Sequence, residues 1–313
     1  MTPSKYLNVE RIEFIVTHLC SGNCRHCSAA EARKSSSPAH VNEKAAVNAV
    51  ACLAQYFNIT SVMTFGGEPL LYPRITAAIH AAAKKAGIPC RQLITNGMFS
   101  KDPKAITTTA RDLVRAGVND VLLSVDAFHS ETLPKEPVTC FAKAMHALAP
   151  ECIRLSPAWV VNREHDNTYN RTTKAILAEY EAMGISSSYG NDIFLSGNAA
   201  KYLAEFYPVP GAVDLSAPCG SAPYTDPPDR VKTLSITPDG SIWACAFKIG
   251  NLLTDSLSDL IANYDPYASP LSAALLSGGV QKMLSYAAKD GIKPDLSSCR
   301  SACDVCRRIC RAY

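Results

Sequence analysis

The chain has 313 residues, with 31 Lys and Arg against 28 Asp and Glu, which gives a formal net charge of +3. A balance this mild does not favour a nucleic-acid partner. The sequence has no apolar run of transmembrane length and no signal-peptide pattern at its start, so we expect a cytoplasmic protein without membrane contact. In a reducing compartment, its 13 cysteines point to metal binding rather than to disulfides.

The first two-thirds of the chain alternates strand-like and helix-like patterns. Alternating apolar residues at Ile12, Phe14 and Val16 predict the first strand. Five further strands are expected where short apolar runs end at turn or polar residues, at 59–65, 88–95, 118–125, 153–161 and 192–195. Helices are expected between them, from Asn42 to about 57, from Pro73 to about Gly87, and at 104–116, 138–148 and 168–183. Six such units imply a parallel sheet with helices outside it, in a barrel or an open doubly wound sheet.

A change in composition divides the chain near residue 208. Prolines crowd into 208–228 and predict a linker or an ordered extended segment. After it, the runs 231–237 and 241–245 flank an Asp-Gly turn and predict a β-hairpin. Helix-like stretches at 256–264 and 271–289 then lead to a cysteine-rich tail. We therefore expect one domain over residues 1–207 and a smaller one over residues 208–313.

Three cysteines follow the first predicted strand with the spacing C-x3-C-x2-C: Cys20, Cys24 and Cys27. Three thiolates on one short loop can hold three irons of a [4Fe–4S] cluster, whereas clusters used only for electron transfer are usually closed by four cysteines. The fourth iron is then open to a small molecule, which suggests chemistry at the cluster. In either parallel-sheet fold, this loop would lie at the C-terminal ends of the strands, where ligands bind.

A second motif, Gly66-Gly67-Glu68-Pro69, lies about forty residues later, between an apolar run and a helix-like segment. With the cysteine loop, it resembles the signature of the radical S-adenosylmethionine (SAM) superfamily. That signature has an aromatic residue before the third cysteine, and His26 occupies this position here. The resemblance implies an α/β fold with a partial TIM barrel, (β/α)6.

The resemblance also implies SAM as cofactor, bound through its amino and carboxylate groups to the open iron. Reductive cleavage of SAM would give a 5′-deoxyadenosyl radical, which removes a hydrogen atom from the substrate. The Gly66–Gly67 backbone and Glu68 would hold the methionine amino group. Other candidate cofactor-binding residues follow predicted strands: Asn96, Ser124, Asp126 and Asn162. Asp126 could equally be a turn residue at a strand end.

The C-terminal third carries six further cysteines: Cys219, Cys245, Cys299, Cys303, Cys306 and Cys310. Four cysteines close one cluster, so six suffice for one but not for two. The stretch 238–257 and the cysteine run after it resemble a SPASM/twitch auxiliary domain. The tail departs from the full SPASM spacing and the sequence ends soon after Cys310, so we expect at least one auxiliary [4Fe–4S] cluster, and a second would be incompletely ligated. Four arginines interleave with the tail as possible countercharges: Arg300, Arg307, Arg308 and Arg311.

The resemblance leaves the substrate open. Relatives of the SPASM type act mostly on peptides or proteins, so we expect peptide oxidation, crosslinking or epimerisation, with a small metabolite as the alternative. We expect no additional N-terminal domain for leader-peptide capture. Aromatic residues that could line a substrate cleft are Tyr6, Tyr189, Phe194, Tyr202, Tyr207 and Tyr224. A flavodoxin- or ferredoxin-type reductant would supply electrons.

Two questions about the cysteines stay open at this stage. Cys219 is either a ligand of the auxiliary cluster, which we favour, or a hydrogen-atom donor to the substrate radical. The whole chain could also be a non-enzymatic zinc or electron-carrier protein, and the tail a zinc site. In that case a fourth ligand for the N-terminal cysteines would come from His18, His26 or His40. The remaining cysteines are expected to be buried and inert: Cys52, Cys90, Cys140 and Cys152.

Overall fold

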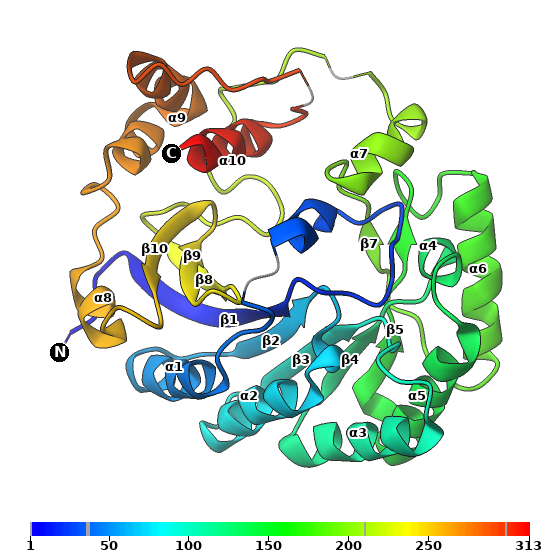
Figure 1. Ribbon diagram of the computed structural model, residues 1–313. Coiled ribbons are helices and arrows are strands. Elements are labelled where there is room, and N and C mark those ends of the chain that lie inside the picture. The colour runs from blue at the N-terminus through cyan, green and yellow to red at the C-terminus, as the bar shows by residue number, and fades with distance from the viewer. Residues whose placement is uncertain (1, 36–37, 210, 298) are drawn as a thin grey trace.

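The computed structural model describes residues 2–35, 38–209, 211–297 and 299–313 (Figure 1). Its main sheet has eight strands in the order β10-β9-β8-β1-β2-β3-β4-β5. The neighbours from β8 through β1 to β5 pair in parallel, and the β8–β9 and β9–β10 pairs are antiparallel. The strands are β1 (Leu7–Thr17), β2 (Ser61–Gly66), β3 (Cys90–Thr95), β4 (Asp120–Leu123), β5 (Ile153–Leu155), β6 (Ala158–Trp159), β7 (Asn191–Asp192), β8 (Val231–Ile236), β9 (Ser241–Ala244) and β10 (Phe247–Asn251).

The helices lie along the outside of this curved sheet and beyond its C-terminal strands (Figure 1). They are α1 (Glu43–Tyr56), α2 (Pro73–Lys85), α3 (Pro103–Ala116), α4 (Ala127–Ser130), α5 (Lys135–Leu148), α6 (Thr168–Glu181), α7 (Asn198–Tyr202), α8 (Leu257–Asn263), α9 (Pro270–Lys289) and α10 (Ala302–Ala312). Short 3₁₀ helices cover Ala30–Ser35, Pro69–Leu71, Pro150–Cys152 and Ala204–Phe206. No helix in the described part of the chain is long and apolar enough to cross a membrane.

Local signals in the sequence explain the best-predicted helices. α1 begins at Asn42, whose side chain accepts a hydrogen bond from the Ala45 amide. α3 begins at Asp102 in the same way and ends at Gly117, whose φ of +91° suits glycine. The expected helices at 138–148 and 168–183 are confirmed as α5 and α6.

The expectation of six parallel strands in one barrel sheet is confirmed for the first four, is confirmed for the fifth only over β5, and is wrong for the sixth. The predicted strand 153–161 is interrupted after β5, because Pro157 has no N–H to donate to a ladder. Its continuation, β6, pairs with β7 in a separate two-stranded sheet. The sixth predicted strand, 192–195, is therefore reduced to β7 and lies outside the main sheet.

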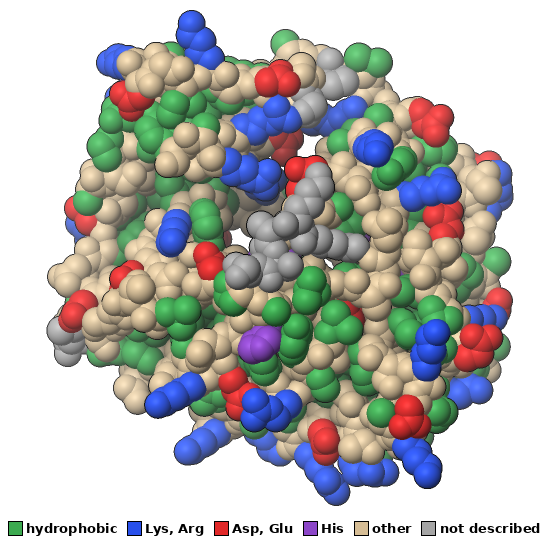
Figure 2. Space-filling view, viewed as in Figure 1, with side chains coloured by type: hydrophobic (Ala, Val, Ile, Leu, Met, Phe, Trp, Pro, Cys, Tyr) green, Lys and Arg blue, Asp and Glu red, His purple; other side chains and the backbone are tan. Residues whose placement is uncertain are grey.

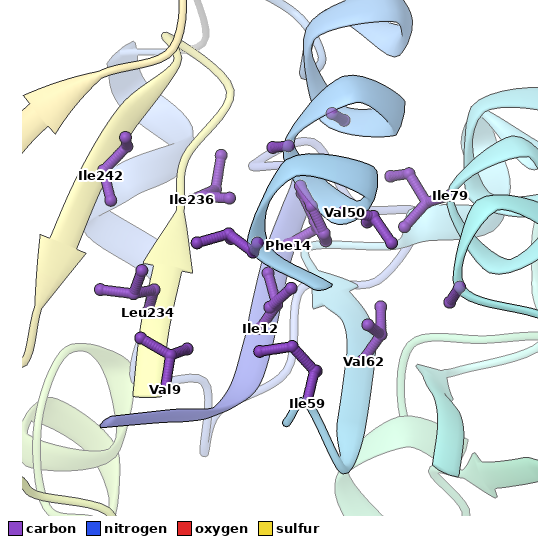
Figure 3. Packing of buried hydrophobic residues seen from close by; sticks show 14 of the residues in the cluster. Val9, Ile12, Phe14, Val50, Ile59, Val62, Ile79, Leu234, Ile236 and Ile242 are labelled. Atoms are coloured by element: carbon purple, nitrogen blue, oxygen red, sulfur yellow. The ribbon is translucent and has the colours of Figure 1, made fainter. Parts of the chain in front are cut away.

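The C-terminal hairpin extends the main sheet. β8 pairs in parallel with β1 on the edge opposite β2, and β9 and β10 continue outward from it. Apolar side chains of these strands share one buried cluster with β1, β2, α1 and α2 (Figure 3). Ile12 and Phe14 of β1 lie between Ile236 of β8 and Val50 of α1 in that view. A single core therefore stabilises this edge of the sheet, whereas cysteines of the C-terminal tail pack in a separate cluster with α9 and α10.

Two features of the C-terminal region were not predicted. β10 is a third strand after the hairpin, and the cysteine tail contains the helix α10. α10 begins with a capping box, in which Ser301 and Asp304 bond each other's backbone. The predicted helix 271–289 is confirmed as α9, but Gly278 and Gly279 interrupt it with a kink.

Candidate functional site

A cavity of about 450 Å³ opens at the C-terminal ends of the parallel strands. All three N-terminal cysteines line it, as expected for the ligands of one metal centre. Six of the other predicted cofactor-binding residues also line it: His26, Gly66, Gly67, Asn96, Ser124 and Asp126. Glu68 and Asn162 are not among the lining residues that the structure describes.

The Gly-Gly-Glu-Pro turn braces the start of the cysteine loop. The Gly67 amide donates to the Thr17 carbonyl at 2.8 Å, and the Glu68 amide donates to the Leu19 carbonyl at 2.8 Å. A Cβ atom at Gly67 would lie 2.0 Å from the Leu19 oxygen, so no other residue fits without moving this backbone. Gly66 has a φ of +131° and is similarly close to Thr17. The close contacts of Gly66 and Gly67 thus fix the backbone of Leu19, the residue before Cys20.

A second brace comes from the N-terminus of α7, which the sequence did not predict. The Asn198 amide donates to the Cys27 carbonyl at 3.0 Å, and its side-chain nitrogen donates to the Cys24 carbonyl at 3.1 Å. Gly197 has a φ of +56°, and a Cβ there would lie 2.6 Å from the Ser28 oxygen. The Gly197-Asn198 pair was the available signal in the sequence, but nothing local shows that it contacts residues about 170 positions earlier.

Glu68 makes several hydrogen bonds inside the protein, and its direct contact with the SAM amino group stays a prediction. Its carboxylate is fully buried and accepts hydrogen bonds from the Leu70 amide at 2.8 Å, the Thr95 hydroxyl at 2.7 Å and the Asn96 amide at 2.8 Å. Burial raises the pKa of Glu68 to about 7, and these three donors oppose that rise. Glu68 therefore holds the ends of β2 and β3 together and positions Asn96.

The Cys24 thiol is buried among other loop residues. Burial raises the pKa of Cys24 to about 12, and the charges of Asp126, Cys20 and Cys27 add to this rise. A bound cation would stabilise the Cys24 thiolate. The donor set fits the three-cysteine iron–sulfur cluster expected from the spacing.

Asp126 and His129 form a buried ion pair beside the loop. Asp126 caps α4 by accepting from the Phe128 and His129 amides, and its other oxygen lies 2.9 Å from Nδ1 of His129. Burial opposes ionisation of Asp126, but the His129 charge and hydrogen bond hold its pKa well below the usual range. Burial likewise opposes a charge on His129, but Asp126 raises the His129 pKa. His129 lines the cavity and was not predicted, because only the turn after β4 brings it there.

His26 completes a possible alternative metal site. Ligand atoms of Cys24, His26 and His129 all lie within 4.8 Å of one another. The His26 ring centroid is 4.9 Å from Phe128 and 5.0 Å from His129. The other two histidines considered for zinc, His18 and His40, are not among the described residues that line the cavity.

Asn162 does not reach the cavity. Its side-chain oxygen accepts from the Glu164 amide at 3.1 Å and the His165 amide at 2.8 Å, so it stabilises a turn after β6. The buried Asn170 holds the same turn through the carbonyls of Val160 and Asn162. A contact between Asn162 and the cofactor stays a prediction.

Two of the six predicted aromatic residues lie at the mouth of the cavity. Phe194 and Tyr224 line it, with ring centroids 6.4 Å apart and exposed fractions of 55% and 83%. Tyr224 has a φ of +58°, which is strained for a residue with a side chain. By contrast, Tyr207 is internal and bonds Val161 and Ile193 through its hydroxyl.

The C-terminal cysteines divide into two groups. Four of them line one pocket and come from the 217–228 segment, the turn after β9, and α10: Cys219, Cys245, Cys303 and Cys306. Burial and the charges of the other three raise the pKa of Cys219 to about 12, and Cys245 has a strained φ of +53°. Cys299 and Cys310 are not among the described lining residues. Four converging thiols fit one closed iron–sulfur cluster.

One short segment joins the two cysteine sites. Cys219 lines the C-terminal pocket, and Tyr224, five residues later, lines the cavity of the N-terminal loop. Five residues span at most about 18 Å. The Tyr224 hydroxyl also bonds Asn191 of β7 at 3.3 Å, which ties the segment to the rim of the cavity.

Comparison with known proteins agrees with this geometry. Residues 14–150 match the family model described as "Radical SAM superfamily". A solved structure described as "Native anSMEcpe with bound AdoMet" aligns with a TM-score of 0.50 at 14% identity, over 84% of this chain and 83% of that one. "Crystal structure of BtrN in complex with AdoMet and 2-DOIA" aligns with a TM-score of 0.47 at 14% identity, over 88% and 90%. No curated protein matches the sequence significantly. Residues 14–150 thus resemble the radical SAM superfamily, and the chain shares its fold with anSMEcpe.

Proposed function

We propose that this protein is a radical SAM enzyme. It would cleave SAM reductively to a 5′-deoxyadenosyl radical that removes a hydrogen atom from a substrate. The observation that carries this proposal is the convergence of three cysteines, the Gly-Gly-Glu-Pro turn and the strand ends on one cavity. The family match over residues 14–150 supports the same chemistry.

The residues of the cavity would hold the cluster and its SAM in fixed positions. Cys20, Cys24 and Cys27 would bind three irons, and the cluster would supply the electron for SAM cleavage. The half-buried Gly66–Gly67 backbone, which lines the cavity, would receive the methionine amino group. Asn96 and Ser124, further along the strand ends, would contact the rest of SAM.

Asp126 would act through His129 rather than on the cofactor directly. Its two oxygens are already engaged by the backbone of α4, by His129 Nδ1 and by the Ala158 amide at 3.1 Å. It would therefore orient the His129 ring toward the cavity. This assignment replaces the direct ribose or carboxylate contact expected from the sequence.

The C-terminal pocket would hold one auxiliary [4Fe–4S] cluster, bound by Cys219, Cys245, Cys303 and Cys306. The convergence of these thiols supports the ligand role of Cys219, since Cys219 is not among the described residues lining the active-site cavity. An auxiliary electron acceptor near the cavity favours net oxidation of the substrate over epimerisation. A flavodoxin- or ferredoxin-type protein would supply the first electron.

The substrate we favour is a peptide or protein side chain or Cα. The exposed Phe194 and Tyr224 rings offer an apolar surface at the cavity mouth, which suits a chain that passes over it. A small metabolite is the alternative. We also infer a cytoplasmic location from the oxygen-sensitive cofactors and the many free cysteines.

A second candidate function rests on the Cys24, His26 and His129 cluster. Three protein ligands of this kind with an open position are typical of catalytic zinc sites. In that case Cys20 and Cys27 would not be needed for metal binding. Anaerobic reconstitution followed by iron, sulfide and zinc analysis distinguishes the two sites.

The test of the proposed function uses the reconstituted protein with SAM and dithionite. We expect 5′-deoxyadenosine together with about eight irons per chain, four for each of two clusters. Peptides from neighbouring genes, analysed by mass spectrometry, would then show a product two mass units lighter for a dehydrogenation. Zinc without iron, or iron without 5′-deoxyadenosine, would contradict the proposal.

A further inference from the structure

The arginines interleaved with the C-terminal cysteines have different surroundings. On the face seen in Figure 2, Lys and Arg side chains lie over the region of α10. Arg300 donates to the Pro208 carbonyl at 2.7 Å and lies over the Tyr207 ring. Arg308 pairs with Asp295. Arg307 is the arginine that lines the pocket of the four cysteines in the described part of the chain.

The helix places Arg307 beside these cysteines. Cys303, Cys306 and Arg307 stand at positions i, i+3 and i+4 of α10, so they share one helix face. Asp304 lies 3.6 Å from the Arg307 guanidinium and is itself fixed by the capping box with Ser301. The charge of Arg307 is therefore held near the pocket although its side chain is 48% exposed.

Arg307 is the one cationic side chain among the described residues that line the pocket. The other charged residue lining the pocket is Asp226, whose carboxylate accepts from the Lys232 amide at 3.0 Å and the Thr233 amide at 2.8 Å. The two backbone amides at the start of β8 therefore partly offset the negative charge of Asp226.

We propose that Arg307 raises the reduction potential of the auxiliary cluster by placing a fixed positive charge beside its thiolate ligands. This inference rests on the proposed function, which supplies the cluster. On reduction the centre gains one electron and no proton, so its charge becomes more negative. A nearby guanidinium stabilises that more negative form, and net charge is one of the factors that set such potentials. Arg307 would thereby favour electron transfer from a substrate radical to this site.

The test uses the full chain with Cys20, Cys24 and Cys27 changed to Ala, so that only the auxiliary cluster contributes. Its midpoint is measured by dithionite titration monitored by electron paramagnetic resonance, alongside the iron content. Arg307→Gln should retain about four irons and shift the reduction equilibrium about tenfold toward the oxidised form, which is about 59 mV for a one-electron couple. Arg307→Lys should shift it less, because the charge remains. Arg311→Gln removes the same charge from an exposed position on α10 and should leave the midpoint unchanged.

The outcomes separate this inference from the proposed function. If the parent triple variant binds no iron, the auxiliary cluster itself is wrong. If it binds iron and Arg307→Gln leaves the midpoint unchanged, only the role of Arg307 is wrong. An equal shift in Arg311→Gln, or loss of iron in both Arg307 variants, would also overturn that role, since the effect would then be nonspecific or structural.

Discussion

The side-chain nitrogen of Asn96 lies 3.4 Å from the Sγ atom of Cys20, while the Asn96 amide donates to the buried Glu68 carboxylate at 2.8 Å. Asn96 therefore connects the Gly-Gly-Glu-Pro turn to the first cysteine of the loop. Glu68 influences the proposed cluster through this neighbour and not by contact. Changes at Glu68 should accordingly affect stability first and cofactor binding second.

Glu68→Gln should destabilise the fold. One oxygen of the carboxylate would become an NH₂ group facing either the Asn96 amide or the Leu70 and Thr95 donors, so buried donors would oppose each other. Leaving such a group unsatisfied costs about 1–3 kcal/mol. Denaturant unfolding measures the loss, with the exposed Glu151→Gln as the control. An unchanged unfolding free energy at Glu68→Gln would show that the three hydrogen bonds contribute little.

The pH dependence of that loss follows from the raised pKa of Glu68, about 7 against its ordinary value of 4.5. Between these values the folded state binds more protons at this site than the unfolded state, so its contribution to stability falls as pH rises. The stability difference between wild type and Glu68→Gln should be larger near pH 5 than near pH 8. A difference that grows with pH would mean that the hydrogen bonds outweigh burial and that the pKa is lowered.

Gly67→Ala should impair the three-cysteine site specifically. The added Cβ would lie 2.0 Å from the Leu19 carbonyl and must displace the residue before Cys20. We expect iron content to fall from about eight to about four per chain, with 5′-deoxyadenosine formation lost. Gly211→Ala is the matched control, because no atom lies within 4 Å of its added Cβ. Full iron and activity in Gly67→Ala would show that the loop tolerates this displacement.

Single cysteine variants should divide the C-terminal set as the pocket does. Cys219→Ala removes a proposed ligand and should lower iron to about four per chain. Cys310→Ala should retain about eight, because Cys310 is not among the described residues lining the pocket. If Cys219→Ala keeps its iron but abolishes deuterium transfer from solvent to product, Cys219 is a hydrogen-atom donor and the epimerase outcome is favoured.

The sequence predicted those parts of the molecule whose signals are local. The caps at Asn42 and Gly117, and the motifs that follow β1 and β2, are readable because turn geometry and cysteine spacing lie within a few residues. The helix α10 was not predicted because its closely spaced cysteines were interpreted only as metal ligands and not as part of an amphipathic helix. Asn198 and His129 were missed because their partners are set by tertiary contacts. The internal hydrogen bonds of Glu68 were not predicted because a sequence does not show which way a carboxylate faces.

The most direct test of the central claim is reductive SAM cleavage by the variant with Cys20, Cys24 and Cys27 changed to Ala. The account predicts no 5′-deoxyadenosine from SAM and dithionite, while about four irons remain at the auxiliary site. Continued formation of 5′-deoxyadenosine by this variant would contradict the assignment of these three cysteines as the ligands of the catalytic cluster.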